Sequence, residues 1–176
     1  MRSINKILVP TDFSEHASAA LEMAIELAQK LDARIVLLHA YQLPIQGAPS
    51  ASTVPSGHLF VHAEETANRL LQAAAAYAQS GVGITTCVLP GPPWEQILEG
   101  AKVHEVSLIV MGSRGLRGLP RLLMGSTAER VVRSSPVPVM VIHAEAVTRE
   151  VETNEAETSE YEGPSLAERL ADQWLI

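Results

Sequence analysis

The chain of 176 residues is poor in cysteine and in aromatic side chains, and it has no long hydrophobic run. Its single cysteine, Cys87, cannot form an internal disulfide, which fits a reducing compartment and predicts a cytoplasmic location. No stretch approaches the roughly 18–20 consecutive apolar residues of a membrane span, and the short run from Ile7 to Pro10 does not match a signal peptide. We therefore expect no membrane association. Because 47% of the residues are hydrophobic, the chain can build one globular core.

Basic charge is also scarce, and the acidic charge is unevenly placed. Residues 1–142 hold 11 acidic and 11 basic side chains, whereas residues 143–176 hold 9 acidic and 2 basic ones. A neutral core without a basic patch argues against nucleic-acid binding. We predict a globular domain over residues 1–144 and an acidic C-terminal extension over residues 145–176. Leu166, Leu170 and Trp174 in this extension have the spacing of a short docking helix.

Short β-branched runs alternate with helical patterns along the domain. Strands are predicted over residues 4–10, 34–40, 83–89, 107–111 and 137–142, and helices over residues 14–31, 58–80, 93–103 and 125–134. Ser14 is the expected N-cap of the first helix. Strands that alternate with helices and are apolar throughout predict an α/β fold. We expect one doubly wound, open, five-stranded parallel sheet of order 3-2-1-4-5, Rossmann-like, with helices on both faces.

A glycine motif follows the fourth predicted strand. Gly112-Ser113-Arg114-Gly115 is separated by nine residues from Gly125-Ser126-Thr127, which opens the last predicted helix. Glycines let the backbone approach a phosphate and adopt positive φ, and amides at a helix start favour anions. The hydroxyls of the serine and threonine add donors, and the loop supplies three cations: Arg114, Arg117 and Arg121. The alternative is an ordinary strand-loop-helix turn with solvated arginines.

A second polar turn, from Val9 to Ser14, follows the first predicted strand. Ligands of open parallel sheets bind at the carboxyl ends of the strands, where the winding direction reverses. If the first and fourth strands are neighbours, Asp12 and Gly112 face the same crevice, and Asp12 can accept hydrogen bonds from a ribose or a base. The alternative is that Asp12 is a helix N-cap.

The motif lacks the parts that a nucleotide-hydrolysing site ordinarily has. The glycine loop contains no Gly-Lys-Ser/Thr, and Glu129 is the only acid near it in that segment. No Ser/His/Asp arrangement with recognisable flanks is present, and we expect no catalytic residues and no protein-borne metal site. We therefore predict a nucleotide-binding regulatory protein. A slow ATPase or nucleotidyl transferase of the same fold, and an interaction protein that binds no nucleotide, stay as alternatives.

The chain resembles the nucleotide-binding subgroup of the universal stress protein family over about residues 3–143. The resemblance rests on ILVPTDFS, on LLHA, and on MGSRG…LLMGSTAERVVRSSPVPVMVI. It implies a role in stress response and a bound ATP, AMP or ADP, with Mg²⁺ as an option beside ATP. The residues implied to contact ribose and base are Pro10, Thr11 and Asp12, with Ala40 lining the adenine pocket. The backbone implied to hold the phosphates comprises Met111, Gly112, Ser113, Arg114, Gly115, Leu116, Arg117, Gly125, Ser126 and Thr127.

The last predicted strand, residues 137–142, is an apolar run at an expected sheet edge. An uncovered edge of this kind invites pairing, and Pro138 limits how far that pairing extends. Together with the family resemblance, this predicts a homodimer through this strand. The resemblance does not identify any other protein partner.

Overall fold

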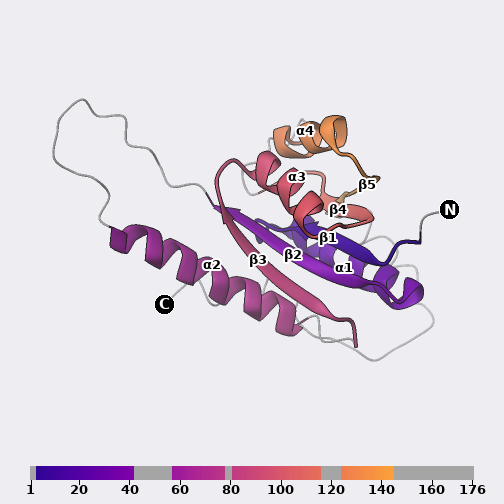
Figure 1. Ribbon diagram of the computed structural model, residues 1–176, viewed down its shortest axis with the longest axis horizontal. Coiled ribbons are helices and arrows are strands. Elements are labelled where there is room, and N and C mark those ends of the chain that lie inside the picture. Colours follow the sequence, from indigo (N-terminus) through magenta and orange to yellow (C-terminus); the bar gives the residue numbers. More distant parts are fainter. Residues whose placement is uncertain (1–2, 42–56, 78–80, 116–123, 145–176) are drawn as a thin grey trace.

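The computed structural model describes residues 3–41, 57–77, 81–115 and 124–144, and it forms a sheet with helices on both faces (Figure 1). The five strands are β1 (Lys6–Pro10), β2 (Arg34–Tyr41), β3 (Ile84–Pro90), β4 (Leu108–Gly112) and β5 (Val139–Ile142). The four helices are α1 (Glu15–Leu31), α2 (Gly57–Tyr77), α3 (Pro93–Val103) and α4 (Ser126–Ser134). All strand pairs are parallel and the order is β3-β2-β1-β4-β5, which confirms the predicted topology.

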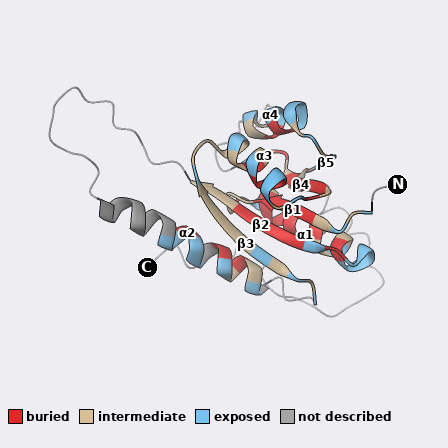
Figure 2. Ribbon diagram, in the orientation of Figure 1, coloured by how far each residue is buried: buried red, intermediate tan, exposed pale blue. Residues whose placement is uncertain are grey.

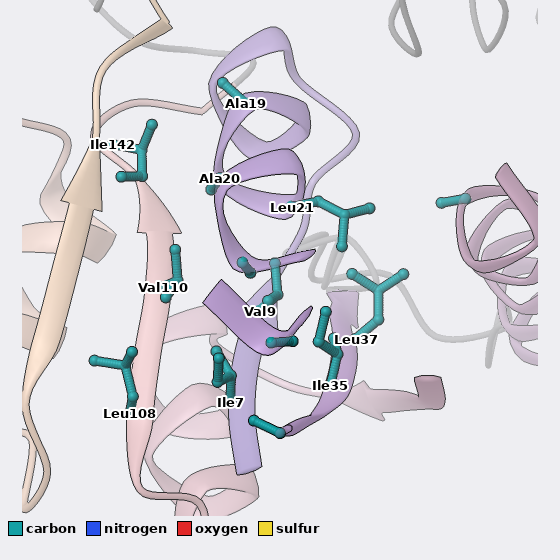
Figure 3. Close-up of a cluster of buried hydrophobic side chains, with 14 of the residues drawn as sticks. Ile7, Val9, Ala19, Ala20, Leu21, Ile35, Leu37, Leu108, Val110 and Ile142 are labelled. Atoms are coloured by element: carbon teal, nitrogen blue, oxygen red, sulfur yellow. The ribbon is translucent and has the colours of Figure 1, made fainter. Parts of the chain in front are cut away.

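Alternate residues of the central strands point into two separate cores. Ile7 and Val9 of β1 lie in a cluster with residues of α1 and α2, as the close-up in Figure 3 shows for the α1 side. Leu8 lies in the other cluster, with residues of α3 and α4. Figure 2 shows the consequence, because the central strands are buried while the helices are exposed on their outer sides. This two-sided burial explains why the central strands are apolar throughout.

The element boundaries follow local chemistry. The Ser14 hydroxyl accepts a hydrogen bond from the Ala17 N–H (3.3 Å), so Ser14 is the N-cap of α1, as predicted. β5 begins two residues later than expected. The Ser135 hydroxyl donates to the Val137 carbonyl (2.7 Å) and accepts from the Val137 N–H (3.2 Å), and Pro138 has no N–H to offer. The turn therefore uses the first residues of the predicted strand.

The winding direction reverses between β1 and β4. The chain moves outward through β2 and β3 and returns to β4 on the other side of β1. β1 pairs with β2 over five residues but with β4 over only two, Ile7 with Leu108 and Leu8 with Ile109. Beyond β1, the Thr11 N–H donates to the Leu38 carbonyl (2.8 Å), so the chain keeps following β2. The carboxyl ends of β1 and β4 are thus the place where this fold positions a ligand site.

The predicted acidic extension, residues 145–176, lies outside the described residues. Within the described part of the chain, no helix has the length and apolar character that a membrane crossing requires.

Gly112 lets α1 lie close against the end of β4, and this close approach is testable. A Cβ at this position would lie 2.8 Å from the backbone carbon and oxygen of His16. We expect Gly112→Ala to lower the free energy of unfolding by about 1–3 kcal/mol, because backbone must move. At Gly83 the nearest atom to an added Cβ is Arg34 Cγ at 3.8 Å, so Gly83→Ala should stay within about 0.5 kcal/mol of the parent. Chemical denaturation measures both, and equal effects would contradict the packing role of Gly112.

Candidate functional site

The turn between β1 and α1 is built on hydrogen bonds from its own side chains. The Asp12 carboxylate accepts from the Ser14 N–H (3.1 Å) and from the Ser14 hydroxyl (2.6 Å), both at Oδ1. The Thr11 hydroxyl oxygen accepts from the Phe13 N–H (3.0 Å). The helix N-cap is Ser14, so Asp12 is not the cap and instead orients the capping serine.

His39 of β2 fastens this turn to the sheet. Its Nδ1 lies 2.8 Å from the Thr11 carbonyl oxygen, which can only accept, so Nδ1 carries the proton and donates. Its ring also packs against the Phe13 ring, with the centroids 4.8 Å apart. Phe13 has φ 64°, a conformation that is uncommon for a residue with a side chain. The two contacts from His39 hold this strained turn, so Thr11 and Asp12 are presented in one fixed conformation.

Ser113 connects the glycine motif to the rest of the sheet. Its N–H donates to the Ile142 carbonyl (2.7 Å) at the end of β5, and its carbonyl accepts from the Gly125 N–H (2.7 Å). Its hydroxyl lies 2.7 Å from Nδ1 of His143, and the residue is only 4% exposed. Ser113 therefore holds the two halves of the glycine motif together, even though nine residues separate them.

The Ser113 hydroxyl contacts one member of a cluster of three basic side chains, His16, Arg114 and His143. An Nη2 hydrogen of Arg114 donates to Nε2 of His143 (3.0 Å), and the His16 ring of α1 meets the His143 ring edge to face at 5.3 Å. Burial, followed by the nearby His143 and Arg114, lowers the pKa of His16. One donor of Arg114 is therefore committed to His143. The other two arginines of the predicted cationic loop, Arg117 and Arg121, lie outside the described residues.

Asp12 and Gly115 bring the two sequence motifs together. A Cβ built on Gly115 would collide with Oδ2 of Asp12, so the carboxylate lies directly against the glycine backbone. This contact confirms the conditional expectation that Asp12 and the glycine motif share one place. The expectation of positive φ is wrong, because among the described glycines positive φ occurs at Gly81 and Gly91 and at no glycine of the motif. The close approach of His16 to Gly112 and of Asp12 to Gly115, and not a positive φ, explains the glycines at these two positions.

The start of α4 has no side-chain cap among the described residues. Gly125 is its N-cap in an extended conformation (φ −76°, ψ 157°) and has no side chain to accept from the first helical amides. The positive end of the helix dipole adds to those amides. Ser126 is exposed and Thr127 is half-buried. Of the other predicted residues, Ala40 and Met111 pack in the core under α3 and α4, Pro10 is buried at the end of β1, and Leu116 and Arg117 lie outside the described residues.

One concavity of the described residues lies away from these motifs. A cleft of about 420 Å³ is bounded by the end of α1 and the starts of β2 and β3, with Asp32, Arg34 and Gly83 in its lining. It is at the amino ends of the strands, whereas ligands of open parallel sheets bind at the carboxyl ends. Residues 116–123, which adjoin the glycine motif, are not described. We therefore place the site by its chemistry and topology, at β1 and β4.

Sequence reasoning did not find His16 and His143 as part of this site. Neither residue belongs to a motif. His143 contacts Ser113, and His16 contacts the ring of His143, only because the start of α1 meets the ends of β4 and β5. A weak signal was present in the sequence, since His143 directly follows the last strand at the carboxyl edge of the sheet.

The fold and the site define an open α/β protein with a glycine motif at its switch point, and comparisons with known proteins agree. Residues 3–143 match the model of the universal stress protein family. A universal stress protein of Methanocaldococcus jannaschii is 34% identical over 140 residues, which cover 78% of this chain and 81% of the relative. The solved structure of another universal stress protein of that organism is 28% identical, with a TM-score of 0.70 over 81% of this chain and 97% of the other. The chain belongs to the universal stress protein family.

Two more distant solved structures of the family contain adenine nucleotides. One is a universal stress protein in complex with cAMP, at 23% identity and a TM-score of 0.56 over 81% of this chain and 99% of the other. The second, from Archaeoglobus fulgidus, is in complex with dAMP, at 20% identity and a TM-score of 0.50 over 80% of this chain and 99% of the other. At these identities the comparison establishes a shared fold.

The hydrogen bonds of Asp12 predict different effects for two substitutions. Asp12→Ala removes the acceptor for both Ser14 donors, so we expect the free energy of unfolding to fall by about 1–3 kcal/mol. Asp12→Asn keeps an amide oxygen at that place and should remain within about 0.5 kcal/mol of the parent. Thermal and chemical unfolding compare the three proteins. If Asp12→Ala is as stable as the parent, Asp12 does not anchor the turn.

Proposed function

We propose that this universal stress protein is a regulatory module that binds an adenine nucleotide, with ATP as the first candidate, at the carboxyl ends of β1 and β4. The observation that carries the proposal is the contact between Asp12 and Gly115, which joins a polar turn to a glycine motif at the switch point of the sheet. A nucleotide needs acceptors for its sugar hydroxyls and donors for its phosphates. The polar turn supplies the acceptors, and the backbone N–H groups of the glycine motif supply the donors.

The phosphates are assigned to the start of α4 and the backbone of the glycine motif. α4 has no capping side chain, and its N-cap Gly125 is held by Ser113, so its first amides are presented in a fixed orientation. In this assignment the backbone from Met111 to Arg117 forms the other wall. The cAMP and dAMP complexes support the assignment at the level of the fold, since they show that it accommodates adenine nucleotides in other members.

The ribose and the base are assigned to the β1 turn. Pro10, Thr11 and Asp12 follow β1, and Ala40 is near the end of the adjacent β2. The described residues contain no group of three metal-ligating side chains. A Mg²⁺ ion accompanying ATP would therefore be coordinated mainly by phosphate oxygens and water, which is its usual preference.

The site supplies binding groups, which favours a regulatory role over catalysis. The geometry contains donors for phosphates at the start of α4. The slow-ATPase alternative is separated from binding by measuring phosphate release in the same samples used for affinity. Phosphate release above the uncatalysed background, even far below the ~10 s⁻¹ of a typical enzyme, would favour that alternative.

Gly125→Ser tests the phosphate assignment, because it should change stability and affinity in opposite directions. A serine at an N-cap accepts from the first-turn amides, so the nucleotide-free protein should be as stable as the parent or more stable. The same hydroxyl then competes with a phosphate for those amides, and ATP affinity should fall about tenfold, or about 1.4 kcal/mol. Thermal unfolding and calorimetric titration give the two values.

Gly125→Ala is the matched control for that substitution. Its Cβ would lie 3.5 Å from the Ser113 carbonyl oxygen, an ordinary contact, and it adds no competing acceptor. We expect a smaller loss of affinity together with a slight loss of stability, since alanine is a poor N-cap. ATP binding to Gly125→Ser as tight as to the parent would show that the α4 amides do not hold a phosphate.

We also propose that the protein forms a homodimer through β5. This strand is at the edge of the sheet, pairs only with β4 among the described strands, and exposes 36% of Met140. Apolar residues on an unpaired edge favour association with a second copy. Met140→Glu should shift the protein toward a monomer at micromolar concentration, measured by light scattering. A parent chain that is already monomeric under these conditions would contradict the proposal.

A further inference from the structure

We propose that His143 is a positioning residue of the nucleotide site, which acts by holding Ser113 and Arg114 in place. The effect on nucleotide affinity rests on the proposed function. The positioning of Ser113 and Arg114 rests on the hydrogen bonds that His143 makes just beyond β5. His143 lies just beyond β5 and belongs to neither sequence motif.

The hydrogen bonds of His143 define its tautomer. The Arg114 guanidinium can only donate, so Nε2 of His143 must accept. A neutral imidazole that accepts at one nitrogen carries its proton at the other, and Nδ1 therefore donates to the Ser113 hydroxyl (2.7 Å). Both bonds coexist only in this form. A second proton would turn Nε2 into a donor that faces another donor.

These contacts reach the phosphate cradle through Ser113. The serine hydroxyl is held by His143, while the carbonyl of the same residue accepts from the Gly125 N–H at the start of α4. Arg114 is the next residue, and its Nε is buried without a hydrogen-bond partner among the described residues. Of its guanidinium nitrogens, Nη2 makes the bond to His143. Loss of that bond would leave the arginine poorly held, at the centre of the first half of the motif.

Two further basic groups lie beside the imidazole of His143. His16 of α1 lies edge to face with the ring, and the guanidinium of Arg114 is on the side of Nε2. The pKa of His16 is lowered, by burial first and then by His143 and Arg114, whereas Asp12 and Glu15 act on it in the opposite sense. Of the two histidines, His143 is the one that makes the hydrogen bonds to Ser113 and Arg114.

The experiment compares the parent with His143→Ala and His143→Asn. ATP affinity is measured by calorimetry at one neutral pH. Hydrogen exchange of the Ser113 and Gly125 amides, measured without nucleotide, reports on the cradle itself. Comparing proteins at one pH cancels the titration of ATP, which all of them share.

We expect His143→Ala to bind ATP about fivefold or more weakly, the effect of about one hydrogen bond, and to lose protection at the Gly125 amide. Asparagine can donate to Ser113, so His143→Asn should retain most of the affinity and protection.

The outcomes separate the two proposals. If the parent binds no ATP but His143→Ala still loses protection at Gly125, the proposed function fails and the positioning role stands. If His143→Ala keeps the protection and the affinity of the parent, the positioning role is overturned. It is also overturned if affinity falls without any loss of protection, or if His143→Asn loses as much affinity and protection as His143→Ala.

Discussion

The hydrogen bond from the Gly125 N–H to the Ser113 carbonyl is the constraint on which the candidate site depends. It places the start of α4 beside the end of β4, although a long loop separates them along the chain. Ser113 can hold that position because its N–H is bonded to the end of β5 and its hydroxyl to His143. A buried residue with all three of its polar groups engaged is a rigid centre, and rigidity lets a short loop present its amides in one orientation.

The sheet itself could be predicted from the sequence, because its signals are local and consistent. The apolar strands predict burial on both faces, and the structure gives each face its own helices and core. Ser14 predicts the start of α1 by the ordinary chemistry of an N-cap. The start of β5 could not be placed as well, since a hydrogen-bonded turn at Ser135 competes with strand pairing and leaves no trace in the apolar pattern.

The site could be predicted in outline but not in mechanism. Spacing alone located the glycines, yet it suggested positive φ where the structure requires close approach to His16 and Asp12. The contacts of His143 depend on how three elements meet, and a sequence pattern does not contain that information. Asp12 could be read either as a cap or as a ligand-facing acid. The structure shows that it anchors the capping serine and also lies against Gly115.

The central claim is that an adenine nucleotide lies between the β1 turn and the start of α4. Titration of ¹⁵N-labelled protein with ATP, followed by amide chemical shifts, tests binding and location together. The account predicts that the largest shifts occur at Thr11, Asp12, Gly115 and the first residues of α4. Shifts confined to the cleft around Asp32 and Gly83, at the amino ends of the strands, or no shifts at all, would contradict it.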